Sequence, residues 1–240
     1  MTTPATSSIL AEPDSLAERL SLVDAEVADA VSSAGRDAAE ITRIVITKFH
    51  PASLVRQLHE LGVRDFGENR HQDAAPKAAS LTDLDATWHF VGQLQSKKVR
   101  GVLSYATVIH SLDRPSLIDA LVAASAPAAS DPIDVFLQLN LTEDPQRGGV
   151  APAAVDELVD GVLAHTQLRL LGVMAVAPLG VAPRSAFATV REVSERVQRS
   201  APHATSISMG MSADFRDAIL EGATHLRIGT AITGKRPEPE

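Results

Sequence analysis

Lys48 is the residue whose type and position point most directly to chemistry. The chain has five lysines, and only Lys48 comes directly after a run rich in β-branched and apolar residues, at positions 41–47. Such a run is typical of a strand buried on both faces. A lysine at the dry end of that strand loses hydration, which favours the neutral amine, a nucleophile toward an aldehyde. The alternative is a lysine that extends its ammonium group into solvent and takes no part in chemistry.

Two segments near the C-terminus have residues that suit an anion. They comprise Ser208, Gly210, Met211 and Ser212 in the first segment, and Gly229 and Thr230 in the second. Each segment lies where a predicted strand ends, and small residues at a helix N-terminus leave backbone N–H groups free for a phosphate. Ordinary turn and capping chemistry explains either segment alone. Two such segments on neighbouring strands indicate a phosphate site.

Arg227 and Asn69 complete the set of candidates. Arg227 stands between Leu226 and Ile228 in a short apolar strand. Because an unpaired buried guanidinium is costly, Arg227 needs a partner. The sequence leaves two partners open, a structural carboxylate or a ring nitrogen of a bound cofactor. Asn69 lies near the end of another predicted strand and therefore near the same site.

Several other chemistries are excluded or weak. The chain has no cysteine, which removes disulfides, thiolate metal sites and cysteine nucleophiles. The segment at 229–235, GTAITGK, resembles a P-loop, but Arg236 stands where the magnesium-binding Ser or Thr is required. The histidines show no H-E-x-x-H spacing, and His89 and His110 are interpreted as satisfied core residues.

The candidates must be positioned by an alternation of strands and helices. A capping box of Ser15 and Glu18 begins a leading helix that ends near Gly35. The predicted strands are 41–47, 63–66, 88–91, 107–110, 133–141, 168–176, 205–209 and 226–228. The predicted helices between them are 51–61, 68–79, 96–104, 115–124, 153–165, 184–199 and 213–221.

Strict alternation of this kind predicts a parallel sheet with right-handed crossovers. Eight repeats favour an α/β fold made of a single-domain (β/α)8 barrel, in which the site lies at the C-terminal ends of the strands. The leading helix could fill the place of a helix missing after the last strand. The alternative is an open doubly wound sheet, which usually has fewer strands and a Gly-rich first turn.

Composition limits the partners and the location. Lys+Arg 22 and Asp+Glu 30 give a formal net charge of −8, which argues against nucleic acid and anionic membranes as partners. No run approaches the roughly 18 apolar residues of a membrane span, and the N-terminus does not read as a secretory signal. We expect flexible tails at 1–12 and 235–240 around a barrel at 13–234, a cytoplasmic location and a monomer.

Five motifs in order resemble those of a known family. They are ITKFHP at 46–51, FGEN at 66–69, WHFVGQLQSKK at 88–98, SMGMSADF at 208–215 and RIGTAITG at 227–234. Together they resemble the pyridoxal 5′-phosphate homeostasis protein family (YggS/PROSC-like), over about Arg43 to Gly234. The resemblance implies a barrel like the alanine racemase N-terminal domain. It also implies that the protein binds pyridoxal 5′-phosphate (PLP) as a Schiff base, without an established catalytic activity.

The resemblance assigns roles to the candidates. Lys48 matches the Schiff-base lysine, Asn69 an asparagine near the cofactor, and Arg227 the arginine that faces the pyridine nitrogen. The two Gly- and Ser-bearing segments match the phosphate-binding segments. The chain departs from the family pattern at Lys97, Arg147 and Thr233, where the family usually has Asn, Lys and an aromatic residue. These departures bear on regulation or cofactor exchange more than on binding.

Three functional hypotheses remain. The first is a non-catalytic carrier that buffers PLP, with apo forms of PLP-dependent enzymes as candidate recipients. The second is a PLP-dependent amino-acid racemase, which needs acid/base groups on both faces of the cofactor. The only tyrosine, Tyr105, is predicted near the end of a helix, at the wrong end of its β/α unit. An arginine on the pyridine nitrogen also weakens the ring as an electron sink. Both observations favour the carrier. The third hypothesis is a scaffold without any cofactor.

Overall fold

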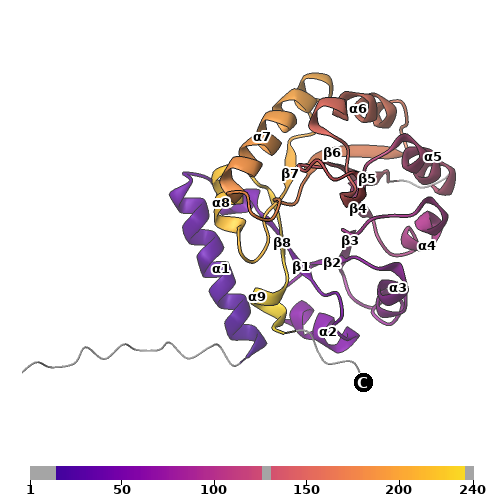
Figure 1. The fold of residues 1–240 in the computed structure, drawn as a ribbon. Helices are drawn as coiled ribbons and strands as arrows, with labels where there is room; N and C mark the ends of the chain where they lie inside the picture. Colours follow the sequence, from indigo (N-terminus) through magenta and orange to yellow (C-terminus); the bar gives the residue numbers. More distant parts are fainter. Residues whose placement is uncertain (1–14, 126–130, 236–240) are drawn as a thin grey trace, which may run out of the picture.

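The strands close into a barrel, as Figure 1 shows. The structure is a computed structural model that describes residues 15–125 and 131–235. The parallel strands follow the chain order β1-β2-β3-β4-β5-β6-β7-β8, and β8 pairs with β1. They are β1 Thr42–Ile46, β2 Asp65–Glu68, β3 Thr87–Phe90, β4 Val108–Leu112, β5 Ile133–Gln138, β6 Leu168–Met174, β7 Ser206–Ser208 and β8 His225–Ile228. This closure confirms the predicted barrel over the open sheet. The tail expected at 1–12 lies outside the described residues, as does the tail expected at 235–240 apart from Lys235.

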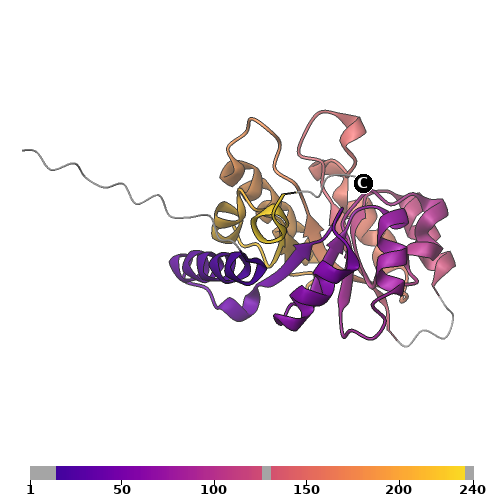
Figure 2. The ribbon, with the colours of Figure 1, turned by 90° about the horizontal axis from the view of Figure 1, so that it is seen from below.

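Helices surround the barrel in a ring (Figure 1). They are α1 Leu16–Ser33, α2 Ala52–Glu60, α3 His71–Ala79, α4 Val99–Val102, α5 Pro115–Ala124, α6 Val155–Leu163, α7 Pro183–Ser200, α8 Phe215–Leu220 and α9 Thr230–Thr233. Short 3₁₀ turns occur at η1 Ala38–Glu40, η2 Ser96–Lys98, η3 Pro145–Arg147 and η4 Pro152–Ala154. In the side view, the connections after β5 and β6 rise beyond the same end of the barrel (Figure 2). No helix in the described ranges is long and apolar enough to span a membrane.

The leading helix α1 closes the ring beside the last strand. The predicted capping box is present, since Ser15 and Glu18 bond each other's backbone N–H. The helix packs against α8 and α9, and the Arg19 Nε donates to the carbonyl of Ile232 at 2.8 Å. The expectation that α1 fills this place is therefore confirmed. The short helix α9, which follows β8, was not predicted.

The boundaries of β2 and α3 differ from the sequence prediction. The strand was predicted at 63–66 and the helix from 68, whereas β2 extends through Glu68 and α3 begins at His71. The ladder with β3 pairs Gly67 with His89 and Glu68 with Phe90. A side chain at Gly67 would lie 2.4 Å from the Ile46 Cδ1, so this strand approaches β1 too closely for anything larger. Glu68, the last residue of β2, is buried, and its carboxylate has a buried cationic partner, described below.

The interior of the barrel is polar as well as apolar. His110 of β4 contacts Ser208 of β7, and these strands are not neighbours in the barrel, so the contact crosses the interior. The His110 ring stacks on Phe136, with centroids 4.5 Å apart. Phe136 belongs to a small apolar cluster with Val108 and Met174, separate from the larger core. The centre of the barrel therefore holds buried polar groups that need hydrogen-bond partners.

Candidate functional site

The predicted site residues gather at the C-terminal ends of the strands. Lys48 follows β1, Asn69 follows β2, and Ser208 ends β7. The β8 segment lies beside the end of β1, since Val45 pairs with Ile228 and a Cβ on Gly229 would be 3.5 Å from the Ile46 Cβ. Parallel strands end at one face of a barrel. The structure therefore brings the turn that carries Lys48 and the Gly229–Thr230 segment to adjacent positions.

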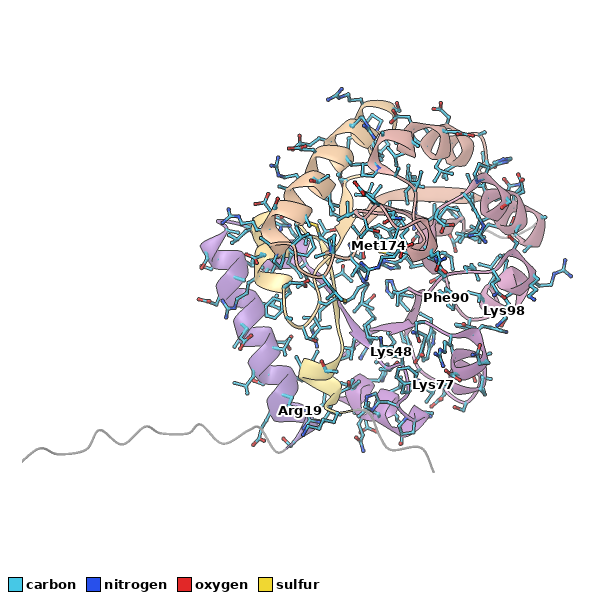
Figure 3. All side chains as sticks on the ribbon, viewed as in Figure 1. Arg19, Lys48, Lys77, Phe90, Lys98 and Met174 are labelled. Atoms are coloured by element: carbon cyan, nitrogen blue, oxygen red, sulfur yellow. The ribbon has the colours of Figure 1, made fainter. Side chains whose placement is uncertain are left out.

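Lys48 is exposed, contrary to the expectation that the barrel mouth removes its hydration. Strand β1 ends at Ile46, and Thr47 takes the last buried position, so Lys48 falls in the following turn. Its Nζ lies 5.9 Å from the centroid of the Phe49 ring. Figure 3 shows Lys48 on the inner side of the ring of helices, with Lys77 farther out toward α3. The lysine that the fold does bury is Lys77, which the sequence analysis left unassigned.

The turn that carries Lys48 is held from both sides. On one side, the Thr47 hydroxyl donates to the Glu68 Oε1 at 2.7 Å, and the Lys77 Nζ donates to the Thr47 carbonyl at 2.8 Å. On the other side, Phe49 has φ 69°, in the left-handed region that costs a bulky residue conformational energy. Lys48 thus extends from a backbone fixed by buried contacts, and only its side chain is free in solvent.

Asn69 offers an unused acceptor. Its backbone is packed closely, since a Cβ on Gly92 would lie 2.1 Å from the Asn69 carbonyl oxygen. Its side-chain Oδ1 is buried and has no hydrogen-bond partner in the structure. A buried polar atom without a partner carries a desolvation cost of about 1–3 kcal/mol. This orphaned oxygen beside the end of β2 fits a ligand that brings a hydrogen-bond donor.

The two Gly- and Ser-bearing segments meet. The Ser212 Oγ accepts from the Ala231 N–H at 3.4 Å, which joins the segment after β7 to the segment after β8. Gly210 has φ +90° and would place a Cβ 2.6 Å from the Ala218 Cβ, so the first turn requires glycine. Met211 and Thr230 are exposed. The hydroxyls of Ser212 and Thr230 and the surrounding backbone supply the donors that an oxyanion binds.

Arg227 is buried among neutral partners. Its NH1 donates to the Ser208 Oγ at 2.7 Å and its NH2 donates to the Ala175 carbonyl at 2.8 Å. Within the described part of the chain, no carboxylate forms an ion pair with Arg227. Of the two partners left open by the sequence, the structural carboxylate is therefore not present there. Burial lowers the pKa of Arg227 to about 10, against a smaller opposing effect of the Asp214 charge. The guanidinium therefore stays charged at neutral pH and retains donors for a ligand atom such as a ring nitrogen.

Sequence reasoning missed a polar chain behind Arg227. His110 bonds Ser208, and His89 lies between His110 and Asp65. The interpretation of both histidines as satisfied core residues is confirmed, but their connection to Arg227 carried no local signal. The Thr47, Glu68 and Lys77 contacts beneath Lys48 were also missed. In the sequence, only the apolar strand before Lys48 indicated that the backbone next to Lys48 would be buried.

Tyr105 lies among residues of the helix–sheet layer. It follows α4, meets Trp88 edge-on at 6.4 Å and stacks near His71 at 6.0 Å between ring centroids. Its hydroxyl is buried, has no hydrogen-bond partner within residues 15–125 and 131–235, and has its pKa raised by burial. Trp88 belongs to the large core. Tyr105 thus packs at the helix end of its β/α unit, as predicted.

The three departures from the family pattern occupy different environments. Lys97 and Arg147 are exposed, in the turns η2 and η3. Thr233 is buried at the end of α9, with its Oγ1 3.2 Å from the Gly229 carbonyl oxygen. Among the described residues, no group of His, Asp and Glu is arranged to hold a metal ion.

Comparisons with known proteins agree with the geometry. The family model "Alanine racemase, N-terminal domain" matches residues 36–237. The pyridoxal phosphate homeostasis protein of Mycobacterium leprae is 40% identical over 236 residues, spanning 91% of this chain and 92% of its own length. The protein of the same name from Pseudomonas aeruginosa is 39% identical over 225 residues, spanning 92% and 96%.

A solved structure shows the same barrel. PipY of Synechococcus elongatus PCC7942, in its form with PLP bound, has a TM-score of 0.81 and 34% identity, covering 92% of this chain and 100% of that one. The resemblance inferred from the five sequence motifs is thereby confirmed. This chain belongs to the pyridoxal phosphate homeostasis proteins, whose barrel is that of the alanine racemase N-terminal domain.

Proposed function

We propose that this protein binds PLP at the C-terminal mouth of its barrel and contributes to PLP homeostasis as a carrier. The observation that carries the proposal is the juxtaposition of the Lys48 turn with the Gly229–Thr230 segment, through the contact of Gly229 with Ile46. An amine and an anion-binding segment on adjacent strands match the two ends of an aldehyde that bears a phosphate. When bound, PLP supplies an aldehyde carbon that forms a Schiff base with a lysine amine and releases water.

Each residue of the site has a role in this proposal. Lys48 provides the amine, and the clamp on Thr47 fixes the backbone from which it extends. Ser212 and Thr230 bind the phosphate, with Ser208, Gly210, Met211 and Gly229 shaping the segments that hold it. Arg227 donates to the ring nitrogen, and the orphaned Oδ1 of Asn69 accepts from the ligand.

The exposure of the mouth supports exchange rather than catalysis. Lys48, Met211 and Thr230 are all exposed, so a bound cofactor would have a short path to solvent. Racemisation requires a second acid/base group opposite the lysine, and Tyr105 packs against Trp88 and His71 instead. We propose a cytoplasmic monomer whose barrel, residues 13–234, buffers PLP and passes it to apo-enzymes. The absence of cysteine from the chain suits a reducing compartment.

Borohydride trapping tests the proposal. The purified protein is incubated with PLP, its absorbance spectrum is recorded, and the imine is reduced and located by peptide mass mapping. We expect an imine absorbance band and the added mass on Lys48. Lys48→Ala should lose both, whereas Lys97→Ala, at a comparably exposed lysine, should retain both. Added mass on Lys97 or Lys98 would refute the assignment of Lys48, and absence of any imine band with excess PLP would refute the function.

An activity measurement separates carrier from racemase. The PLP-loaded protein is incubated with single enantiomers of several amino acids, and the enantiomeric ratio is followed. We expect no conversion above the rate of free PLP. Conversion that disappears in Lys48→Ala would show that the protein is a catalyst.

A further inference from the structure

A chain of four hydrogen bonds crosses the barrel interior and ends on Arg227. Its distances are 2.7 Å from Arg227 NH1 to Ser208 Oγ, 2.9 Å from Ser208 Oγ to His110 Nδ1, 3.0 Å from His110 Nε2 to His89 Nδ1, and 3.0 Å from His89 Nε2 to Asp65 Oδ1. These residues come from β8, β7, β4, β3 and β2. Ser208, His110 and His89 are buried, so water does not compete for their bonds.

The two ends of the chain fix its direction. The guanidinium of Arg227 can only donate, and the ionised carboxylate of Asp65 can only accept. Asp65 is half-buried and lies near a second cation, the guanidinium of Arg43. Burial lowers the pKa of Arg43, and the Asp65 charge acts in the opposite direction. The His89 Nε2 must therefore carry the proton of its bond to Asp65.

The Arg227 end gives the same direction. The buried Ser208 oxygen accepts from Arg227, and among the described residues the acceptor for its own proton is the His110 Nδ1. The His110 proton is therefore on Nε2 and is donated to the His89 Nδ1. Burial, with the nearby charge of Arg227, keeps the pKa of His110 well below its usual value, so that ring is neutral. Its Nδ1 then accepts the Ser208 hydroxyl proton. The Ser208 oxygen then has only lone pairs to offer, and one of them accepts the hydrogen bond from Arg227 NH1.

We propose that Asp65, His89 and His110 are positioning residues for Arg227, acting through the Ser208 hydroxyl. In this chain the Ser208 hydroxyl donates its proton to His110. The Ser208 oxygen therefore always presents an acceptor to the guanidinium. The Ala175 carbonyl supplies the second fixed acceptor. The guanidinium is thus held in one orientation, ready to donate to a heteroaromatic ring nitrogen. This last step rests on the proposed function, whereas the chain itself does not.

The apo-protein provides the first test, through the ¹⁵N shifts of the histidine side chains. We expect His89 and His110 to be neutral with the proton on Nε2 in both rings. A proton on Nδ1 of His110, or an imidazolium at either position near neutral pH, would overturn the proposal. Because no PLP is present, this result is independent of whether the protein binds the cofactor.

A broken chain provides the second test. His89→Phe keeps a ring in place but removes the link to Asp65. The matched control is His225→Phe, since His225 also lies against Phe136 and near His110 but has no hydrogen bond to either. We expect hydrogen exchange of the Arg227 guanidinium to rise about tenfold in His89→Phe, the factor that corresponds to about 1.4 kcal/mol, and to stay near the wild-type rate in the control.

Affinity for PLP completes the comparison. In His89→Phe we expect the dissociation constant to rise by a similar factor while the imine on Lys48 still forms. Unchanged guanidinium exchange together with unchanged affinity would refute the positioning role and leave the proposed function intact. Failure of wild-type protein to bind PLP would refute the proposed function, and the exchange result would still decide the role of the chain. If His89→Phe does not fold, Asp65→Ala removes the terminal acceptor at a half-buried position and is judged by the same criteria.

Discussion

The Nζ of Lys77 lies 2.5 Å from the Oε1 of Glu68, and the two side chains are 7% and 1% exposed. This buried ion pair lies beneath the turn that presents Lys48, because both partners also bond Thr47. The other carboxylate oxygen, Oε2, has no hydrogen-bond partner among the residues that the structure describes. A buried pair of this kind is costly to break on one side only, since the remaining charge then has nothing to neutralise it.

Lys77→Met should therefore destabilise the protein strongly. It leaves the Glu68 carboxylate buried and unpaired and removes one contact to the Thr47 carbonyl. We expect the free energy of unfolding to fall by about 3–5 kcal/mol, measured by urea denaturation at neutral pH. The affinity for PLP should fall as well, because the turn before Lys48 loses one of its two anchors.

The double variant Lys77→Met, Glu68→Gln separates charge from packing. It removes both charges, and we expect it to recover more than half of the lost stability. A double variant that is as unstable as Lys77→Met would mean that shape, rather than the unpaired carboxylate, determines the loss. Lys235→Met, at an exposed lysine past the last helix, should change the stability little.

This pair also shows why part of the site could not be predicted from the sequence. Lys77 and Glu68 are nine positions apart and were both assigned to one predicted helix, 68–79. Hydrophobic periodicity places Lys77 on a helix correctly, but its burial depends on where β2 ends and how α3 folds back over it. At that turn the N-cap residue is Arg70, which makes no side-chain capping hydrogen bond, so the start of α3 was not marked by a typical cap.

The rest of the site follows from a single topological rule. In a parallel barrel, residues after each strand meet at one face, so Lys48, Asn69 and Thr230 could be grouped before any coordinates. The bond of His110 to Ser208 could not, because it joins strands that are not adjacent and depends on the width of the barrel. Of the two alternatives for Lys48, the structure shows the exposed side chain, because the predicted strand 41–47 continued one residue past the end of β1.

Gly210→Ala should damage both stability and PLP binding. Its φ of +90° disfavours any side chain, and the new Cβ would lie 2.6 Å from the Ala218 Cβ on α8. The strand-to-helix turn must then shift, and with it the backbone before Ser212. We expect a loss of more than about 2 kcal/mol in the free energy of unfolding, from backbone strain together with overpacking, and weaker binding of PLP in a titration.

Gly222→Ala is the matched control for this substitution. Gly222 has φ +92°, but an added Cβ would meet only the Ile207 Cδ1 at 3.8 Å. Gly222→Ala should therefore lose only the free energy due to backbone strain, about 1 kcal/mol of unfolding free energy, and should retain PLP binding. Equal losses of stability in the two variants would contradict the steric role assigned to Gly210.

Ser212→Ala and Thr230→Val test the phosphate assignment. Each variant removes one hydroxyl from the segments that the Ser212 contact with Ala231 joins. If each hydroxyl donates to a phosphate oxygen, PLP affinity should fall by about 1.5–3 kcal/mol, the range for a hydrogen bond to a charged group. Pyridoxal, which lacks the phosphate, should bind the wild type and both variants equally in the same titration. An equal loss of affinity for PLP and for pyridoxal would show that the hydroxyls do not bind the phosphate.

His225 determines the direction of the pH dependence of stability. Its ring is packed against Phe136, and its Nδ1 lies 2.8 Å from the Thr224 Oγ1. Burial, with the charge of Arg227, lowers the pKa of His225 to about 4 despite the opposing charge of Asp65. The unfolded chain takes up a proton at the ordinary histidine pKa of about 6.5. Between these two values the unfolded state binds one more proton than the folded state.

The free energy of unfolding should therefore fall as the pH drops from about 6.5 to about 4, with no further loss from this residue below that. The difference between the two pKa values corresponds to about 3 kcal/mol. His110, whose pKa is also lowered, acts in the same direction. Urea denaturation of the wild type and of His225→Gln at several pH values isolates the contribution of His225. The carboxylates titrate in both proteins, so their effect cancels in the comparison. The wild type should lose about 3 kcal/mol more than the variant between pH 7 and pH 4, and parallel stability curves would show that His225 is not held in its neutral form.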